Sequence, residues 1–192
     1  MPSRSAAGSL LRGLVVLALI ACPAAVAPAL GVGTTPRVDA AAFIVVDPAT
    51  GETLAQRAPD RELPMASTTK MMTALVALSA LDPGDRLTVP AQALSVGESS
   101  ARLVEGETLS VRDLLVGLLV ASGNDAALTL AIGAAGSEAA FVERMNLRAE
   151  ELGLEHTRFA NSHGLDAPGH HSTVRDLVTL GRETMRDPLL RA

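Results

Sequence analysis

The stretch "PMASTTKMMTALVAL", residues 64–78, contains Lys70, the only lysine in a chain of 192 residues whose other cationic side chains are arginines. Proline followed by an apolar run predicts a helix that begins just after Pro64 and ends at "DPG", residues 82–84. Ser67 precedes Lys70 by three residues. On a helix this spacing places both side chains on one face, with Cβ atoms about 5–6 Å apart.

A serine beside a lysine suggests a nucleophile and its base. The hydroxyl attacks a carbonyl effectively only when a base removes its proton. Lysine can do so only as a neutral amine, with its pKa lowered from about 10.4 to roughly 7–8 by burial or a nearby cation. Arginine keeps its proton and cannot take this role. The single lysine among arginines therefore favours a catalytic Lys70; the alternative is an ordinary solvated helix residue.

A second motif is "SGN", residues 122–124, at a break after an apolar helix. Its hydroxyl can relay a proton, and its amide can donate to and accept from a peptide. The alternative is a helix end followed by a helix start, because Asn124 and Asp125 are both good N-cap residues.

The remaining chain predicts helices with strands mainly at the front. A β-branched run at 41–47, a turn at 47–51 and a returning strand at 52–57 predict a hairpin at the edge of a sheet, with the first strand buried. Residues 85–90 are expected to be extended. Four further helices are expected, at 114–121 behind the capping box 110–113, at 126–134, between Ser137 and Gly153, and after 172–176 up to Pro188.

Composition excludes some functions. Hydrophobic residues make up 48% of the chain, with no Trp or Tyr, so the core must consist of Ala, Leu and Val. A net charge of −5 and an aromatic content of only 2% argue against a nucleic-acid partner. Four histidines, with Asp166 nearby, match no zinc spacing and are expected on a polar loop, namely His156, His163, His170 and His171. We therefore expect no metal and no cofactor.

The first 29 residues have the pattern of a secretory signal peptide. Arg4 and Arg12 flank a short n-region, an apolar run covers 13–21, and small residues follow. We expect residues 1–29 to be a signal peptide, 30–39 a lead-in and 40–192 the folded domain, exported to the extracytoplasmic or periplasmic cell envelope. Alternatives are an uncleaved anchor, or lipidation of Cys22 in "LIAC". Association with a membrane stays open.

Together the two motifs resemble the Ser-x-x-Lys and Ser-x-Asn signatures of penicillin-binding proteins. The segments "ASTTKMMTA", "LLVASGNDAA", "FVERMNLRAEELGL", "TRFANSHGLD" and "HHSTVRDL" also occur in the order typical of the low-molecular-weight members. The chain thus resembles the serine-type D-alanyl-D-alanine carboxypeptidases over nearly all of 40–187. The resemblance implies an α/β (α+β), β-lactamase/transpeptidase-like fold, with a helical cluster on an antiparallel sheet that is incomplete here.

The resemblance also implies roles. Ser67 is the acylated nucleophile, Lys70 the general base, Ser122 the proton shuttle to the leaving D-alanine, and Asn124 the residue that holds the peptide amide. Implied partners are the D-Ala-D-Ala terminus of peptidoglycan stem peptides and the β-lactams that mimic it. Whether the enzyme is a carboxypeptidase or an endopeptidase is left open.

One family motif is missing. The third motif, Lys-Thr-Gly, lies on a strand beyond the second, whereas no lysine follows Lys70. We therefore expect 40–192 to be the N-terminal portion of such a domain, inactive or feeble by itself. The alternatives are a protein that binds wall peptides without turnover, and a class A β-lactamase. The latter would carry Asp where Gly123 stands and a deacylating Glu, which 161–169 lacks.

Overall fold

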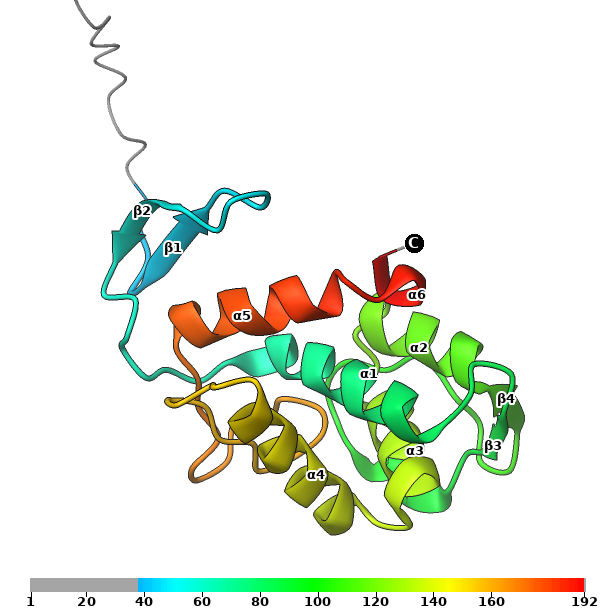
Figure 1. Ribbon diagram of the computed structural model, residues 1–192. Helices are drawn as coiled ribbons and strands as arrows, with labels where there is room; N and C mark the ends of the chain where they lie inside the picture. Colours follow the sequence, from blue (N-terminus) through cyan, green and yellow to red (C-terminus); the bar gives the residue numbers. More distant parts are fainter. Residues whose placement is uncertain (1–37, 192) are drawn as a thin grey trace, which may run out of the picture. The chain divides into compact units, whose positions relative to one another are not determined.

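Helix α1 (Thr69–Ala80) contacts four of the other helices and forms the centre of the computed structural model, which describes residues 38–191 (Figure 1). The other helices are α2 (Val111–Leu119), α3 (Asn124–Ala135), α4 (Glu138–Glu151), α5 (Val174–Thr184) and the short α6 (Pro188–Arg191). Two short 3₁₀ helices are η1 (Ala66–Thr68) and η2 (Ala91–Ser95). The expected signal peptide, Cys22 and most of the lead-in lie outside the described residues.

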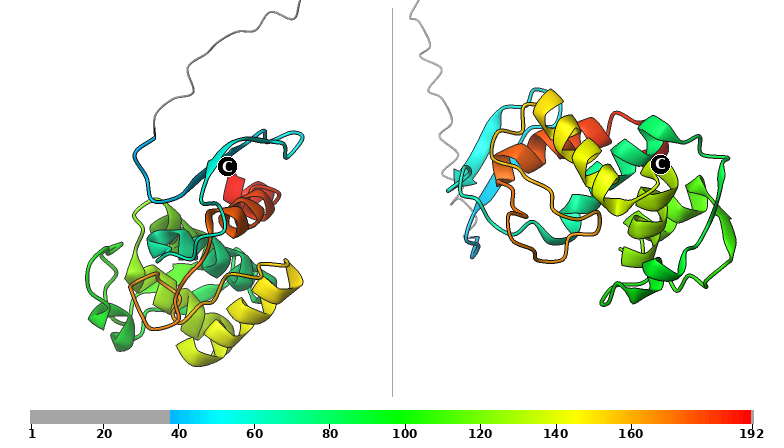
Figure 2. Two further views of the ribbon diagram at one scale, coloured as in Figure 1. Left: turned by 90° about the vertical axis from the view of Figure 1, so that its left-hand side faces the viewer. Right: turned by 90° about the horizontal axis from the view of Figure 1, so that it is seen from below.

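Two antiparallel hairpins accompany the helices. Strands β1 (Phe43–Val46) and β2 (Thr53–Arg57) pair in the first, which packs on α5, and β3 (Arg86–Thr88) and β4 (Thr108–Ser110) pair in the second (Figures 1 and 2). The predicted front hairpin and the extended segment at 85–90 are confirmed. The expected burial of the first strand is wrong, since Val45 is 47% exposed. Strand β4 was not predicted from the sequence.

The core lies between α1 and the helices around it. Its side chains are mainly Ala and Leu with some Val, as the composition predicts, but Met side chains and the fully buried Phe141 and Phe159 also belong to it. Residues 124–131 of α3 are buried, so this helix is covered on all sides. An α-helix covered all round is a rigid support for any group placed at its start.

Helix ends agree with the sequence in three places and differ in two. The Ser110 and Ser137 side chains each cap a helix as predicted, and within 172–176 it is Thr173 that caps α5. Pro188 begins α6 and does not simply stop α5, since proline is tolerated in a first helical turn. Asn124 and Asp125 do not cap α3; the N-cap residue is Gly123, and both side chains are used elsewhere.

No single helix among residues 38–191 is long and apolar enough to cross a membrane. Only α3 and α4 taken together pass the same test of length and composition, as a pair bent by 86°.

Candidate active site

Ser67 lies in η1, immediately before α1, and is exposed. The expected helix is therefore confirmed from residue 69 onward, whereas its first turn is tighter than an α-helix. The turn begins at Ala66, whose φ of +47° is unusual for a residue with a side chain. Gly164 packs against this backbone so closely that a Cβ there would lie 2.1 Å from the Ala66 carbonyl oxygen. The position of Ser67 is thus fixed from outside its own helix.

Lys70 is 2% exposed and its amine has three partners. The Nζ atom lies 2.6 Å from the backbone oxygen of His163, 2.8 Å from Asn124 Oδ1 and 3.2 Å from Ser67 Oγ. Three acceptors match the three N–H groups of an ammonium. The predicted pairing of Ser67 with Lys70 is present in the structure.

The same three contacts determine what happens when the amine loses its proton. A neutral amine has two N–H groups and one lone pair. The carbonyl oxygen of His163 and the amide oxygen of Asn124 have no hydrogen to give, so they keep the two N–H groups. Only Ser67 Oγ can donate, and the lone pair is left facing it. Deprotonation therefore turns Lys70 into an acceptor for the Ser67 hydroxyl.

The electrostatic setting favours that neutral form. Burial lowers the pKa of Lys70 from 10.5 to about 8, although the negative charges of Asp125 and Glu98 act against it. This is a change of about 3 kcal/mol at 1.36 kcal/mol per unit. A pKa near 8 suits a general base that works close to neutral pH.

Asn124 is the first residue of α3 and is 2% exposed. Its Nδ2 donates to the backbone oxygen of Gly97 at 2.8 Å. Because a carbonyl only accepts, the amide nitrogen must face Gly97, and the amide oxygen is thereby turned toward Lys70. Asn124 thus lies beside Lys70, where the sequence motif suggested it.

Ser122 completes the group around Ser67. Its hydroxyl donates to Ser67 Oγ at 2.9 Å. The residue has a φ of +54°, an uncommon conformation for serine that costs of order 1–3 kcal/mol and often marks functional sites. All four residues singled out from the sequence therefore meet in one place, drawn from η1, α1, the turn before α3 and the first residue of α3.

Sequence reasoning missed the turn at residues 161–165, which supplies the His163 oxygen. Asn161 Oδ1 accepts from the amides of His163 (3.2 Å) and Gly164 (2.7 Å), and its Nδ2 donates to Leu165 O (2.7 Å). From outside, Thr73 Oγ1 donates to Ser162 O at 2.6 Å. Asparagine before glycine within "NSHGL" was the available turn signal, but only the tertiary structure places the turn beside α1.

The other histidine contacts are structural. His170, expected on a polar loop, is buried: its Nδ1 accepts from the Ala160 amide and its Nε2 lies 2.9 Å from Thr69 Oγ1. Burial lowers its pKa, and that of His163 too. His156 and His171 lie 3.4 and 3.8 Å from Glu62. Residues 38–191 contain no group of three or more His, Cys, Asp or Glu arranged to hold a metal.

Gly123 separates this site from that of a class A β-lactamase. A Cβ at this position would lie 2.6 Å from Asp125 Oδ1 and 2.8 Å from the Ala101 nitrogen. The aspartate that those enzymes carry at the middle of the motif does not fit here without displacing the neighbouring backbone.

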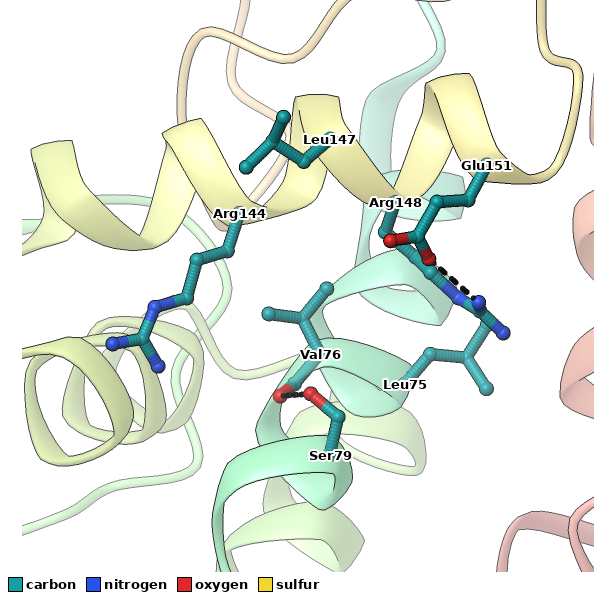
Figure 3. Close-up of a pocket in the computed structure, with 7 residues that line it drawn as sticks. All are labelled: Leu75, Val76, Ser79, Arg144, Leu147, Arg148 and Glu151. Carbon is teal, nitrogen blue, oxygen red and sulfur yellow. Dashed lines mark hydrogen bonds and ion pairs between the residues drawn. The ribbon is translucent and has the colours of Figure 1, made fainter.

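A groove of about 440 Å³ between α1 and α4 is a less suitable site (Figure 3). Its polar groups already have partners within the protein. Arg148 pairs with Glu151 at 2.9 Å, and the Ser79 hydroxyl donates to Val76 O. The groove contains none of the residues around Lys70.

A serine hydroxyl facing a buried lysine amine is the arrangement found in serine enzymes in which lysine replaces histidine as the base. Comparison with known proteins gives the family. Residues 31–191 match the peptidase S11 family, D-alanyl-D-alanine carboxypeptidase, and the chain belongs to this family. It is 40% identical over 193 residues to the D-alanyl-D-alanine carboxypeptidase DacC of Escherichia coli, a match that covers 93% of this chain and 48% of the relative.

Solved structures agree. Penicillin-binding protein 6B from Escherichia coli matches with a TM-score of 0.76 and 40% identity, covering 81% of this chain and 53% of that one. A D-alanyl-D-alanine carboxypeptidase from Mycobacterium tuberculosis matches with a TM-score of 0.77 and 37% identity, covering 83% and 61%. These matches confirm the predicted fold class. The chain spans about half the length of the curated relative that it matches.

Proposed function

We propose that the chain provides the acylation site of a serine D,D-carboxypeptidase. Ser67 attacks the carbonyl between the two terminal D-alanines of a peptidoglycan stem peptide, the C–N bond breaks, D-alanine leaves, and water then hydrolyses the ester. The observation that carries the proposal is the Lys70 amine, whose only partner able to donate a proton is Ser67. Membership of the family supplies the substrate class.

Each residue takes one step of the proton path. Lys70, neutral above its pKa of about 8, receives the Ser67 proton during attack. Ser122, whose hydroxyl contacts Ser67 Oγ, passes a proton to the leaving amine. Asn124 mainly orients Lys70. One N–H of its Nδ2 donates to Gly97 O, so the second N–H is the one that can donate to a substrate carbonyl. General acid–base help of this kind is worth about 10²–10⁴ in rate.

We propose the same chemistry for β-lactams, whose acyl group would remain on Ser67. We also propose that residues 1–29 direct export, so that the domain from residue 40 acts in the bacterial cell envelope. The apolar run at 13–21 and the small residues after it support export. Sequencing the N-terminus of the mature protein from cells tests this, with a start near residue 30 expected.

Labelling with a fluorescent penicillin tests the acylation site. The chain, in which no Lys-Thr-Gly motif follows Lys70, is expected to bind the label slowly but covalently. Both Ser67→Ala and Lys70→Arg are expected to lose the label, because the first removes the nucleophile and the arginine of the second cannot release its proton. Ser79→Ala, which removes a hydroxyl from the same helix without touching the site, is the matched control and should label normally. Label retained by Ser67→Ala contradicts the proposal, and no label on any variant favours a protein that only binds wall peptides.

A further inference from the structure

The segment 97–103 wraps around the start of α3. The Asn124 amide donates to Ser99 O at 2.9 Å, and the Asn124 side chain donates to Gly97 O at 2.8 Å. The segment has no helix or strand, and Glu98 and Arg102 have φ values of +70° and +61°. A conformation of this kind persists only where the surrounding structure enforces it.

Asp125 makes most of the contacts that hold the segment 97–103 in this conformation. Its carboxylate is 2% exposed and accepts from Ser100 Oγ (2.6 Å), Ala101 N (2.8 Å) and Leu103 N (3.2 Å). Burial raises the pKa of Asp125, but hydrogen bonds from Ser100 and from backbone amides outweigh it, and the net pKa is lowered. No Lys, Arg or His forms an ion pair with it among residues 38–191. The buried charge is thus stabilised mainly by the segment that it holds, together with the Ala126 amide, which donates to Oδ1 at 2.8 Å.

The segment in turn controls Asn124. Gly97 O is the acceptor that forces the Asn124 amide nitrogen away from Lys70. Without that acceptor the amide could rotate and present N–H groups to Lys70. An N–H facing the amine would repel the ammonium form and would occupy the lone pair of the neutral form. The close contact between Gly123 and Ala101 also ties the segment to the turn that carries Ser122.

We infer that Asp125 is a positioning residue for acylation: it holds the segment 97–103 so that Gly97 O keeps the Asn124 amide oxygen on Lys70. The inference rests on the proposed function of Ser67 and Lys70. Asp125 touches neither of those two side chains in any hydrogen bond, and acts through Asn124 and its neighbours.

The charge of Asp125 and its effect on the position of Asn124 can be separated, because the first changes the pKa of Lys70 and the second changes the maximal labelling rate. Asp125 faces the amine from α3 and Glu98 faces it from the segment 97–103; both raise its pKa. His163 faces it from the 161–165 turn, with Glu138 behind. Removing the Asp125 charge lowers the pKa of Lys70, which alone would raise the rate at neutral pH. Loss of position lowers the rate at every pH.

The experiment compares Asp125→Asn with Asp176→Asn in the full chain. Asp176 is a matched control: it is 7% exposed and its carboxylate accepts from the His156 amide and the Thr157 hydroxyl, away from Lys70. Two quantities are measured, the hydrogen exchange of backbone amides and the rate constant of covalent labelling by a fluorescent penicillin between pH 6 and 10.

Asp125→Asn is expected to accelerate hydrogen exchange in 97–103. It is also expected to lower the maximal labelling rate about 10²-fold, because misplacement of a reacting group has an effect of this size. The pH at which labelling is half-maximal is expected to move below about 8. Asp176→Asn is expected to accelerate exchange near 156–157 and to leave the half-maximal pH unchanged. If Asp125→Asn fails to fold by circular dichroism, Ser100→Ala, which loses one bond to the carboxylate, is expected to accelerate exchange and lower the maximal labelling rate in part, and to leave the half-maximal pH near 8 because the Asp125 charge remains.

The outcomes distinguish this inference from the proposed function. If the parent chain is labelled, but Asp125→Asn leaves the maximal labelling rate or the exchange in 97–103 unchanged, only the role of Asp125 is overturned. Absence of label on the parent chain overturns the proposed function and the role of Asp125 in it.

Discussion

Two loops each supply one carbonyl oxygen to the surroundings of Lys70, and they are held in different ways. The segment 97–103 gives Gly97 O to Asn124 and is fixed mainly by one buried charge, Asp125. The turn 161–165 gives His163 O to Lys70 and is held by several groups, among them the neutral amide of Asn161 and the Glu138 carboxylate, which accepts from Ser162 N and Ser162 Oγ. The turn packs closely on Ala66 and should tolerate no added atom, whereas the segment 97–103 should depend mainly on the single buried charge that it binds.

The largest effect is expected for the 161–165 turn. Gly164→Ala places a Cβ 2.1 Å from Ala66 O at a φ of +96°, so η1 or the turn must move. We expect a loss of stability of more than about 2 kcal/mol and loss of penicillin labelling. Urea unfolding and labelling measure both. Gly106→Ala, at a φ of +78° with open space around it, has the same backbone strain without the collision. It should cost about 1–2 kcal/mol and label normally.

The amine between the two loops sets the pH dependence. Under the proposed function only its neutral form can accept the Ser67 proton, and its pKa is about 8, so the labelling rate should rise tenfold per pH unit below 8 and level off above it. At pH 6 we expect a rate about 10² below the maximum. Labelling rates measured from pH 6 to 11 check this. A rise that continues beyond pH 10 would mean that Lys70 titrates as an ordinary lysine.

Removing the side-chain amide of Asn161, which closes the turn 161–165, should have a moderate effect on stability and on labelling. Asn161→Ala loses two acceptor contacts and one donor contact, which releases His163 O from Lys70. We expect a stability loss of about 1–3 kcal/mol and labelling slowed about tenfold. Asn146→Ala is the control, because that amide also makes three backbone contacts, to Val142 and Phe159, away from Lys70. Equal slowing by both variants would show that stability alone is measured.

The smallest effect is expected at Glu98. Its charge raises the pKa of Lys70 from the exposed side of the segment 97–103. Glu98→Gln should therefore move the half-maximal pH of labelling downward by a few tenths of a unit, and 1 M salt should remove most of the difference, because salt screens exposed charges. Glu105→Gln, also exposed, is the control and should cause no shift.

Much of the secondary structure could be predicted because its signals are local. Ser110 and Ser137 each predict a helix from a capping pattern that spans four residues, and the turn residues at 47–51 predict the front hairpin. Asn124 and Asp125 were misjudged for the same reason: both have the chemistry of a cap. Their side chains instead satisfy Lys70 and the segment 97–103, which local preference cannot foresee.

The sequence by itself identified Ser67 and Lys70 as the candidate pair, because side chains three residues apart lie on one face of a helical stretch, and it identified Ser122 and Asn124 as candidates through their motif. Only the tertiary structure decided which atoms of these groups contact one another. Burial of Lys70 at 2% exposure lowers its pKa, and His163 O and Asn124 Oδ1 leave its lone pair to Ser67. Desolvation and the direction of hydrogen bonds depend on chain segments that lie 54 and 93 residues away, and no local pattern encodes them.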